Sequence, residues 1–157
     1  MNTEWHEQNR MPDDAGMAQR IKWHLEHARE CGCRPIPESV LAEILKRFDT
    51  PDETRNMIKG RFEVATIEGV TIGRATYEPG WKWSEHVGRA LGQQRCTVEH
   101  VGFVVSGTAT AGFEDGRVDI LEAGKRFYVP SDPHDSWVVG NERYVSLHFV
   151  GADHYSR

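Results

Sequence analysis

After residue 60 the chain consists of short apolar runs separated by turn residues, and this pattern limits the folds it can adopt. Twelve of the 15 glycines lie in residues 61–157, where frequent tight turns need backbone conformations that other residues adopt poorly. The runs between the turns are rich in β-branched and aromatic residues: FEVATI, VTIGRATY, WKWSEHV, HVGFVVSG, TATAGF, RVDIL, RFYVP, SWVV and RYVSLHFV. Asp115-Gly116, between TATAGFE and RVDIL, is a two-residue hairpin signal. Many short strands at this spacing predict a β-sandwich or barrel rather than a parallel α/β sheet.

The first 60 residues have a different pattern. Residues 1–16 show no period and predict a loosely held arm with one short helical turn. Apolar residues recur at helical spacing in Met17–Glu30 and again in Pro37–Phe48, which predicts two helices with one apolar stripe each. Residues 54–59 are expected to add one more helical turn. We therefore expect an N-terminal arm and helical extension over residues 1–60, and a β-barrel over residues 61–157. The barrel or a second subunit should cover the helical stripes.

Composition excludes several classes of partner. With 157 residues, the chain is long enough for one domain and a short appendage. Its net charge is -5, and neither half is basic, so we expect no nucleic-acid partner. No apolar run approaches the roughly 18 residues that cross a bilayer, and the polar start has no secretory core, which favours a cytoplasmic location without membrane contact. Three cysteines favour reduced thiols or metal ligands over a disulfide framework.

Three histidines stand on or beside separate predicted strands: His86, His100 and His134. A closed barrel would bring these sequence-distant imidazoles to one point, and convergent neutral imidazoles hold divalent transition metals. The alternative is that each is a surface or hydrogen-bonded residue. We expect one ion of iron, zinc, manganese, nickel or copper, bound by all three. Cys96 could equally be a buried small residue, a reactive thiol or a soft ligand.

The region around the first two histidines resembles the first signature motif of the cupin superfamily, G-x5-H-x-H followed by a glutamate that precedes x6-G. Gly80 and His86 match the glycine and the first histidine. Gly88 stands at the second histidine position. Counting back six residues from Gly107 places His100 at the position of the glutamate. Gly88, and Gly102 beside His100, are expected to leave space near the metal.

The second cupin motif, G-x5-P-x-G-x2-H, resembles residues 124–135. Gly124 and Pro130 match, while Asp135 stands at the histidine position, one residue after His134. The resemblance covers about the last 95 residues and implies a mainly β, cupin-like double-sheet (jelly-roll) barrel, preceded here by two short helices.

The same resemblance implies a metal-dependent small-molecule enzyme, oxygenase-like or lyase/isomerase-like, whose substrate chelates the three-histidine site. Cupin barrels often pair, so we expect a homodimer. Glu85 and Asp135 are the candidate catalytic residues because each is adjacent in sequence to an expected ligand. His148 is expected to lie either toward the cavity or toward solvent, and His6 and His154, near the termini, are given no role.

The helical segment carries a second group of metal-binding residue types. His24, His27 and Cys31 share one helix face at i, i+3, i+7, and Cys33 follows. The run H-x3-C-x-C resembles, with one residue fewer, the H-x3-C-x2-C of zinc-binding anti-sigma factors. These residues form either a zinc site or a polar helix face with two unpaired cysteines. The alternative function is accordingly a metal- or ligand-sensing regulatory module whose helical segment contacts a partner protein.

Overall fold

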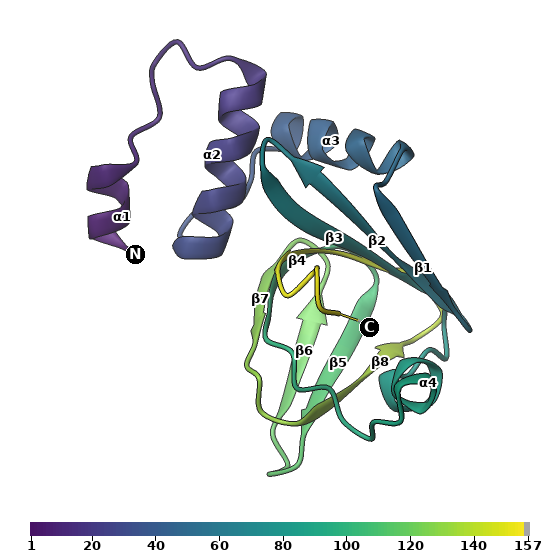
Figure 1. Cartoon of the computed structure of the whole chain (residues 1–157). Coiled ribbons are helices and arrows are strands. Elements are labelled where there is room, and N and C mark those ends of the chain that lie inside the picture. Colours follow the sequence, from purple (N-terminus) through teal and green to yellow (C-terminus); the bar gives the residue numbers. More distant parts are fainter. Residues whose placement is uncertain (156–157) are drawn as a thin grey trace.

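The computed structural model describes residues 1–155, in which two antiparallel sheets follow an N-terminal group of helices (Figure 1). The larger sheet has the strand order β1-β2-β3-β9-β4-β7, and the smaller has the order β6-β5-β8. The strands are β1 Glu53–Met57, β2 Gly60–Ile67, β3 Val70–Tyr77, β4 His100–Ser106, β5 Thr108–Phe113, β6 Val118–Glu122, β7 Arg126–Val129, β8 His134–Val139 and β9 Tyr144–Val150. The prediction of a mainly β protein with two sheets and a few helices is confirmed.

Barrel closure and jelly-roll topology stay predictions, because no ladder joins the two sheets within residues 1–155. The hairpin signal is confirmed. β5 pairs with β6 around Asp115-Gly116, where the Phe113 amide donates to the Arg117 carbonyl at 2.9 Å. Gly116 has φ 92°, a conformation that favours glycine.

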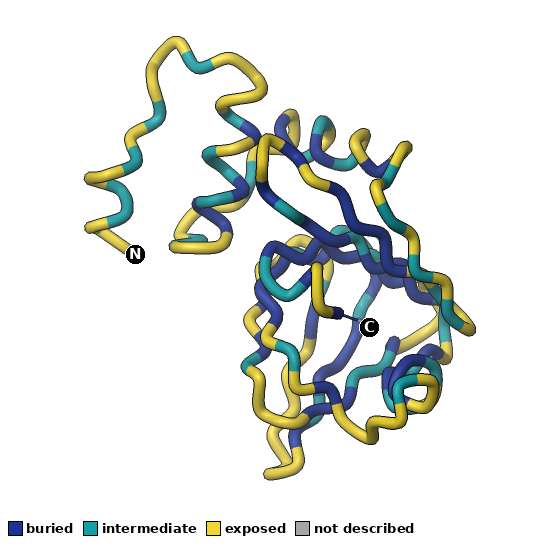
Figure 2. Tube along the Cα trace, viewed as in Figure 1, coloured by how far each residue is buried: buried dark blue, intermediate teal, exposed yellow. Residues whose placement is uncertain are grey.

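Four helical elements precede the sheets: α1 Thr3–Gln8, α2 Met17–Glu30, α3 Glu38–Lys46 and the 3₁₀ helix η1 Arg47–Asp49. α2 has the predicted bounds, and α3 with η1 covers the second predicted helix. Their buried apolar residues pack on the outer face of β2, β3 and β9, in a cluster that includes Leu25, Val40, Ile44, Phe48, Ile67, Ile72, Leu147 and Phe149. Figure 2 shows how burial varies along the trace of the helices and strands. The chain's own sheet therefore covers both helical stripes. No helix within residues 1–155 is long and apolar enough to cross a membrane.

The other face of the larger sheet packs against the smaller sheet. This second core is aromatic-rich and includes Phe62, Tyr77, Trp81, Trp83, Phe113, Phe127, Tyr144 and Tyr155. Side chains of successive strand residues point to opposite faces. One set of residues on β2, β3 and β9 therefore faces the helices, and the alternate set faces the second core.

Two local predictions are wrong. The helical turn expected at residues 54–59 is instead strand β1 and its turn, because pairing with β2 supplies backbone hydrogen bonds that a single isolated turn lacks. The strand expected at WKWSEHV is largely the π-helix η2, Ser84–Gly88, followed by α4, Arg89–Leu91. Asp135 fixes the start of η2 by accepting from the Ser84 amide (3.0 Å) and hydroxyl (2.8 Å). The larger sheet begins at Glu53, seven residues before the boundary at residue 60 that the sequence predicts between the helical extension and the β-domain. Residues 156 and 157 of the expected β-domain lie outside the described part.

The two glycines expected to leave space near a metal leave none. A Cβ on Gly102 would lie 2.1 Å from the Leu147 carbonyl oxygen and 2.4 Å from the Phe127 ring. A Cβ on Gly88 would lie 2.4 Å from the Gln93 carbonyl oxygen and 2.5 Å from the Trp83 ring. Both glycines permit close packing rather than an open coordination position.

We predict that Gly102→Ala lowers the free energy of unfolding by about 3 kcal/mol, because the added methyl meets backbone in a packed sheet. Chemical denaturation followed by circular dichroism measures this. Gly16→Ala is the matched control, since Gly16 has φ -72° and no atom within 4 Å of a Cβ built on it. The control should change stability by less than about 1 kcal/mol. Equal effects in the two variants would contradict the packing at Gly102.

Candidate metal centres

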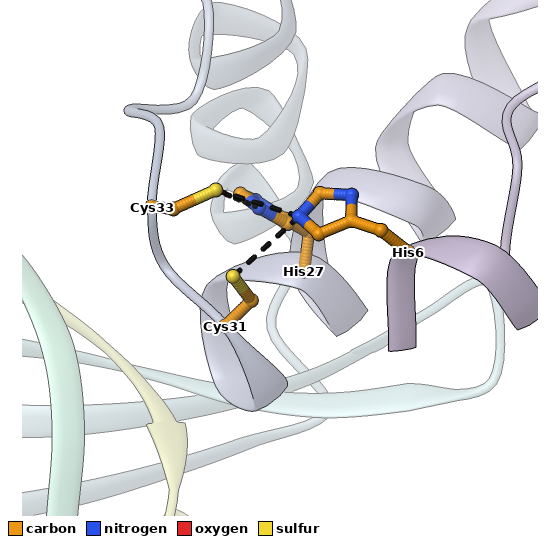
Figure 3. Close-up of side chains that lie close together, drawn as sticks. All are labelled: His6, His27, Cys31 and Cys33. Carbon is orange, nitrogen blue, oxygen red and sulfur yellow. Dashed lines mark hydrogen bonds between the residues drawn. The ribbon is translucent and has the colours of Figure 1, made fainter. Parts of the chain in front are cut away.

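Four metal-binding side chains from the first 33 residues converge at one point (Figure 3). His6, His27, Cys31 and Cys33 each offer a donor atom, and these atoms lie within 4.8 Å of one another. We call this group the helical site. His27 is on the last turns of α2, and Cys31 caps the end of that helix. Gly32, with φ 65°, reverses the chain so that Cys33 returns toward His27, and His6 reaches the group from α1.

The distances between donor atoms in the helical site match a tetrahedral ion. The Nε2 atom of His6 lies 3.5 Å from Cys31 Sγ and 3.4 Å from Cys33 Sγ, and His27 Nε2 lies 3.3 Å from Cys33 Sγ. Zinc bonds of about 2.3 Å to sulfur and 2.0–2.1 Å to nitrogen place tetrahedral ligands about 3.6 Å apart. Two thiolates and two imidazoles form a closed donor set that favours zinc.

Few contacts other than this group hold α1 against α2. The Trp5 ring packs on Trp23 at 5.3 Å between centroids, and Trp23 stacks on His27 at 4.8 Å. The Trp23 indole donates to the Asn9 carbonyl at 2.6 Å. α1 itself contains no buried residue. The placement of the arm should therefore depend strongly on the four donor atoms.

The sequence identified three of these four residues. His24 shares the helix face as expected, but it is not in the group, and His6 takes that place. The signal for His6 was its residue type alone. The helical spacing of seven residues indicates that His24 and Cys31 lie on one face of α2. His6 lies near Cys31 only because residues 9–16 place α1 beside the end of α2, and helical spacing does not predict that path.

The two thiols of the helical site differ in acidity. Hydrogen bonding from the Asn2 amide, at 3.2 Å from the sulfur, lowers the pKa of Cys31 to about 6. Hydrogen bonding with Cys31 raises the pKa of Cys33. The metal-free site thus holds one thiolate and one thiol near neutral pH, and a bound cation would favour deprotonation of both.

A second group lies between the sheets and consists of Cys96, His100 and His134, all buried, with donor atoms within 4.8 Å of one another. We call this group the sandwich site. Backbone pairing between Cys96 and His134, with bonds of 2.8 and 3.1 Å, positions two of them. His100 and His134 are the first residues of β4 and β8. Cys96 Sγ lies 3.6 Å from His100 Nε2, which again suits two ligands of one zinc-like ion.

The hydrogen bonds of these imidazoles leave nitrogen atoms for a cation. His134 Nδ1 donates to the Asp132 carbonyl at 2.7 Å, a contact that fixes the ring of many metal-binding histidines. Within residues 1–155, His134 Nε2 is buried without a hydrogen-bond partner. His100 Nε2 lies next to the Cys96 thiol, 3.6 Å from its sulfur. Leaving a buried polar atom unpaired costs about 1–3 kcal/mol, so a bound ion would relieve a real penalty.

Of the other residues considered from the sequence, only His148 joins the surroundings of the sandwich site. Its buried ring lies 5.4 Å from that of His100, and its Nε2 atom lies 3.0 Å from the Ser146 hydroxyl. The cavity side, one of the two positions left open by the sequence, is therefore the one found. His86 is not in the group. It lies on η2 instead of a strand, with Nδ1 2.9 Å from the Lys82 amide nitrogen.

The expected catalytic carboxylates lie outside the sandwich site. Asp135 is buried and accepts from Ser84 and from the Ser136 amide, at 2.9 Å from the latter. Its carboxylate is also 3.8 Å from the Lys82 ammonium. Glu85 is exposed on η2. Neither belongs to the group of donor atoms, and their assignment to catalysis stays a prediction.

A cavity of about 40 Å³ adjoins the sandwich site. Its lining includes Tyr77, Trp81, Trp83, Cys96, His100, Phe127, Tyr144, His148 and Tyr155. This is space for about three water-sized bodies. Sites for drug-sized ligands usually have about 300–1,000 Å³, so this cavity suits an ion with a very small ligand.

Burial keeps the sandwich site uncharged when it holds no metal. It lowers the pKa of His148 to about 4 and that of His100 well below the ordinary value. It raises the pKa of the Cys96 thiol to about 11. At pH 7 the rings are neutral, which is the form that binds metals, and the thiol would lose its proton on binding.

No family model matches the chain, and no curated protein matches it. Among solved structures, similar ones include procruciferin, an 11S globulin from Brassica napus (16% identity, 68% of this chain, 30% of that chain, TM-score 0.48). Another is a tryptophan-to-tyrosine variant of oxalate decarboxylase from Bacillus subtilis (16%, 68% and 29%, TM-score 0.46). A third is a protein of unknown function (DUF1255) from Acinetobacter sp. ADP1 (12%, 63% and 90%, TM-score 0.46). This chain spans less than a third of the first two. These similarities do not establish the cupin family, which stays a prediction, and they assign no activity.

We predict that the metal-free protein loses stability as the pH falls from about 6.5 to about 4. The imidazoles of His100 and His148 stay neutral in the folded state while those of the unfolded chain bind protons, so acid favours unfolding. A fall of the His148 pKa from 6.5 to about 4 corresponds to about 3 kcal/mol at the acid end. Urea titrations across this range measure it.

In His148→Gln the free energy of unfolding should fall less between about pH 6.5 and pH 4 than in the parent, because the buried ring that stays neutral is gone. Above about pH 7, where the His148 ring is neutral in both the folded and unfolded parent, the substitution should not change how stability varies with pH. The control is His154→Gln, because the side chain of His154 is 80% exposed. A slope unchanged by His148→Gln, or reduced equally by His154→Gln, would contradict the buried neutral ring.

Proposed function

We propose that this protein is a metal-responsive regulatory module with two metal centres. Zinc in the helical site fixes the N-terminal arm on α2, and this ordered surface contacts a partner protein. A divalent transition metal in the sandwich site binds a small ligand. The observation that carries the proposal is the convergence of His6, His27, Cys31 and Cys33 at ligand-to-ligand distances near 3.4 Å.

The helical site supports a regulatory role because its four protein donors leave no position for a substrate. Sites of this kind contribute folding free energy rather than chemistry. An ion in this site would link residues that are distant in sequence, since His6 and Cys33 are 27 positions apart. Zinc binding would therefore select one placement of an arm that otherwise has no buried residue in α1.

The sandwich site supports a receptor role because the cavity beside it is small and lined by buried side chains. Its three donors leave open coordination positions, which also suit catalysis. A metal-dependent oxygenase-like or lyase/isomerase-like enzyme is accordingly the second candidate, restricted to substrates of a few atoms. Turnover of such substrates by the metal-loaded protein, lost in His134→Ala, would favour the enzyme. Pairing of two chains stays a prediction.

We predict that protein purified without an affinity tag and loaded with zinc binds about two ions per chain. Cys33→Ser and His134→Ala should each reduce this to about one, because removal of one ligand weakens binding strongly. The double variant should bind none tightly. Elemental analysis after dialysis measures the stoichiometry, and His154→Gln is the control. Two ions retained in either single variant would contradict the site assigned to that residue.

We predict that iodoacetamide alkylates Cys31 at least about tenfold faster than Cys33 in metal-free protein at about pH 7.5. The low pKa of Cys31, about 6, makes it largely thiolate at that pH, while the pKa of Cys33 is raised. Zinc should protect both. Mass spectrometry of the peptides gives the two rates, and loss of zinc protection in His6→Ala tests the role of α1. Equal rates without metal would contradict the Asn2 contact, and no protection by zinc would contradict the site.

A further inference from the structure

Two tryptophans beside the sandwich site each have a buried indole N–H without a hydrogen-bond partner in residues 1–155. Trp81 is 1% exposed and Trp83 is 2% exposed, and both line the cavity that contains Cys96, His100 and His148. An indole nitrogen can only donate. Two donors without acceptors next to a group of metal-binding atoms point to an acceptor bound between them.

The packing of both rings limits where their N–H groups can point. The benzo edge of Trp83 packs on Gly88, since a Cβ there would lie 2.5 Å from Cζ3 and 3.1 Å from Cε3. The Nε1 edge is on the opposite side of the ring. One face of the Trp81 ring is covered by Tyr77, with 3.7 Å between ring centroids and 2° between ring planes. Both tryptophans line the same cavity as Cys96 and His100.

Charge indicates which acceptor suits this space. A divalent ion with one thiolate from Cys96 and two neutral imidazoles would carry a net charge of about +1. Asp135 does not cancel this charge, because its carboxylate faces the Lys82 ammonium at 3.8 Å as well as Ser84. In a buried site a single negative charge would complete the neutralisation, whereas a dianion would reverse it.

We propose that the cavity binds one small monoanion of about three non-hydrogen atoms, held by the sandwich-site metal and by the indole N–H groups of Trp81 and Trp83. The volume of about 40 Å³ admits an anion the size of formate, azide or hydroperoxide. Hydrogen bonds from two indoles to a charged acceptor give the site its selectivity. This proposal rests on the proposed metal in the sandwich site and names the class of ligand that the metal receives.

The test uses the full chain loaded with cobalt(II), whose visible bands report coordination. Azide and formate should each produce a saturable difference spectrum. The helical site has four protein ligands and no open position, so the change reports the sandwich site, and His134→Ala should abolish it. Citrate, which is too large, should produce no change. Trp81→Phe and Trp83→Phe should each raise the apparent Kd for azide roughly 10- to 100-fold.

Trp137→Phe is the matched control, because Trp137 is on β8 but does not line this cavity. Near-ultraviolet circular dichroism checks that each variant keeps its packing. The proposal is wrong if cobalt binds but neither anion changes its spectrum. It is also wrong if both cavity variants keep the parent Kd, because the two indole N–H groups then donate to water and not to the anion. If no cobalt enters the sandwich site, the metal proposal fails as well, and the two failures are thereby distinguished.

Discussion

The position of α1 against α2 depends on four donor atoms that lie within 4.8 Å of one another. Sulfur and imidazole nitrogen atoms this close, in a segment with little apolar core, are held weakly unless a cation binds them. α1 has no buried residue. Its Trp5 ring contacts the ring of His27 on α2, and Trp23 stacks on the same ring, which is itself one of the donors. An ion here would set the position of the arm, whereas the sheets fold around cores of their own.

The helices beyond the arm are fixed by ordinary burial. α2 and α3 place Leu25 and Ile44, both fully buried, on the outer face of the larger sheet. One side chain also links the end of α2 to the strands around the cavity. Arg126 of β7 donates to the Ala28 carbonyl at 3.2 Å, and its neighbour Phe127 packs on the ring of His148. The helical site and the sandwich site are thus connected through one strand.

The sequence was most informative where local pattern and tertiary structure agree. Helical periodicity located α2 to the residue, and alternating apolar runs with Asp115-Gly116 located the β5–β6 hairpin. Local pattern failed where a distant partner decides the structure. In the WKWSEHV run, the Ser84 amide at the start of η2 donates to Asp135, 51 positions away in sequence. His86 therefore lies outside the group of donor atoms, and Cys96 enters it through backbone pairing with His134.

The proposed helical site would hold zinc through two sulfur and two nitrogen atoms. Zinc K-edge X-ray absorption of the His134→Ala protein, which retains only that site, tests it most directly. We expect four-coordinate zinc with two sulfur atoms at about 2.3 Å and two nitrogen atoms at about 2.0–2.1 Å. A spectrum that fits only oxygen and nitrogen ligands would contradict it.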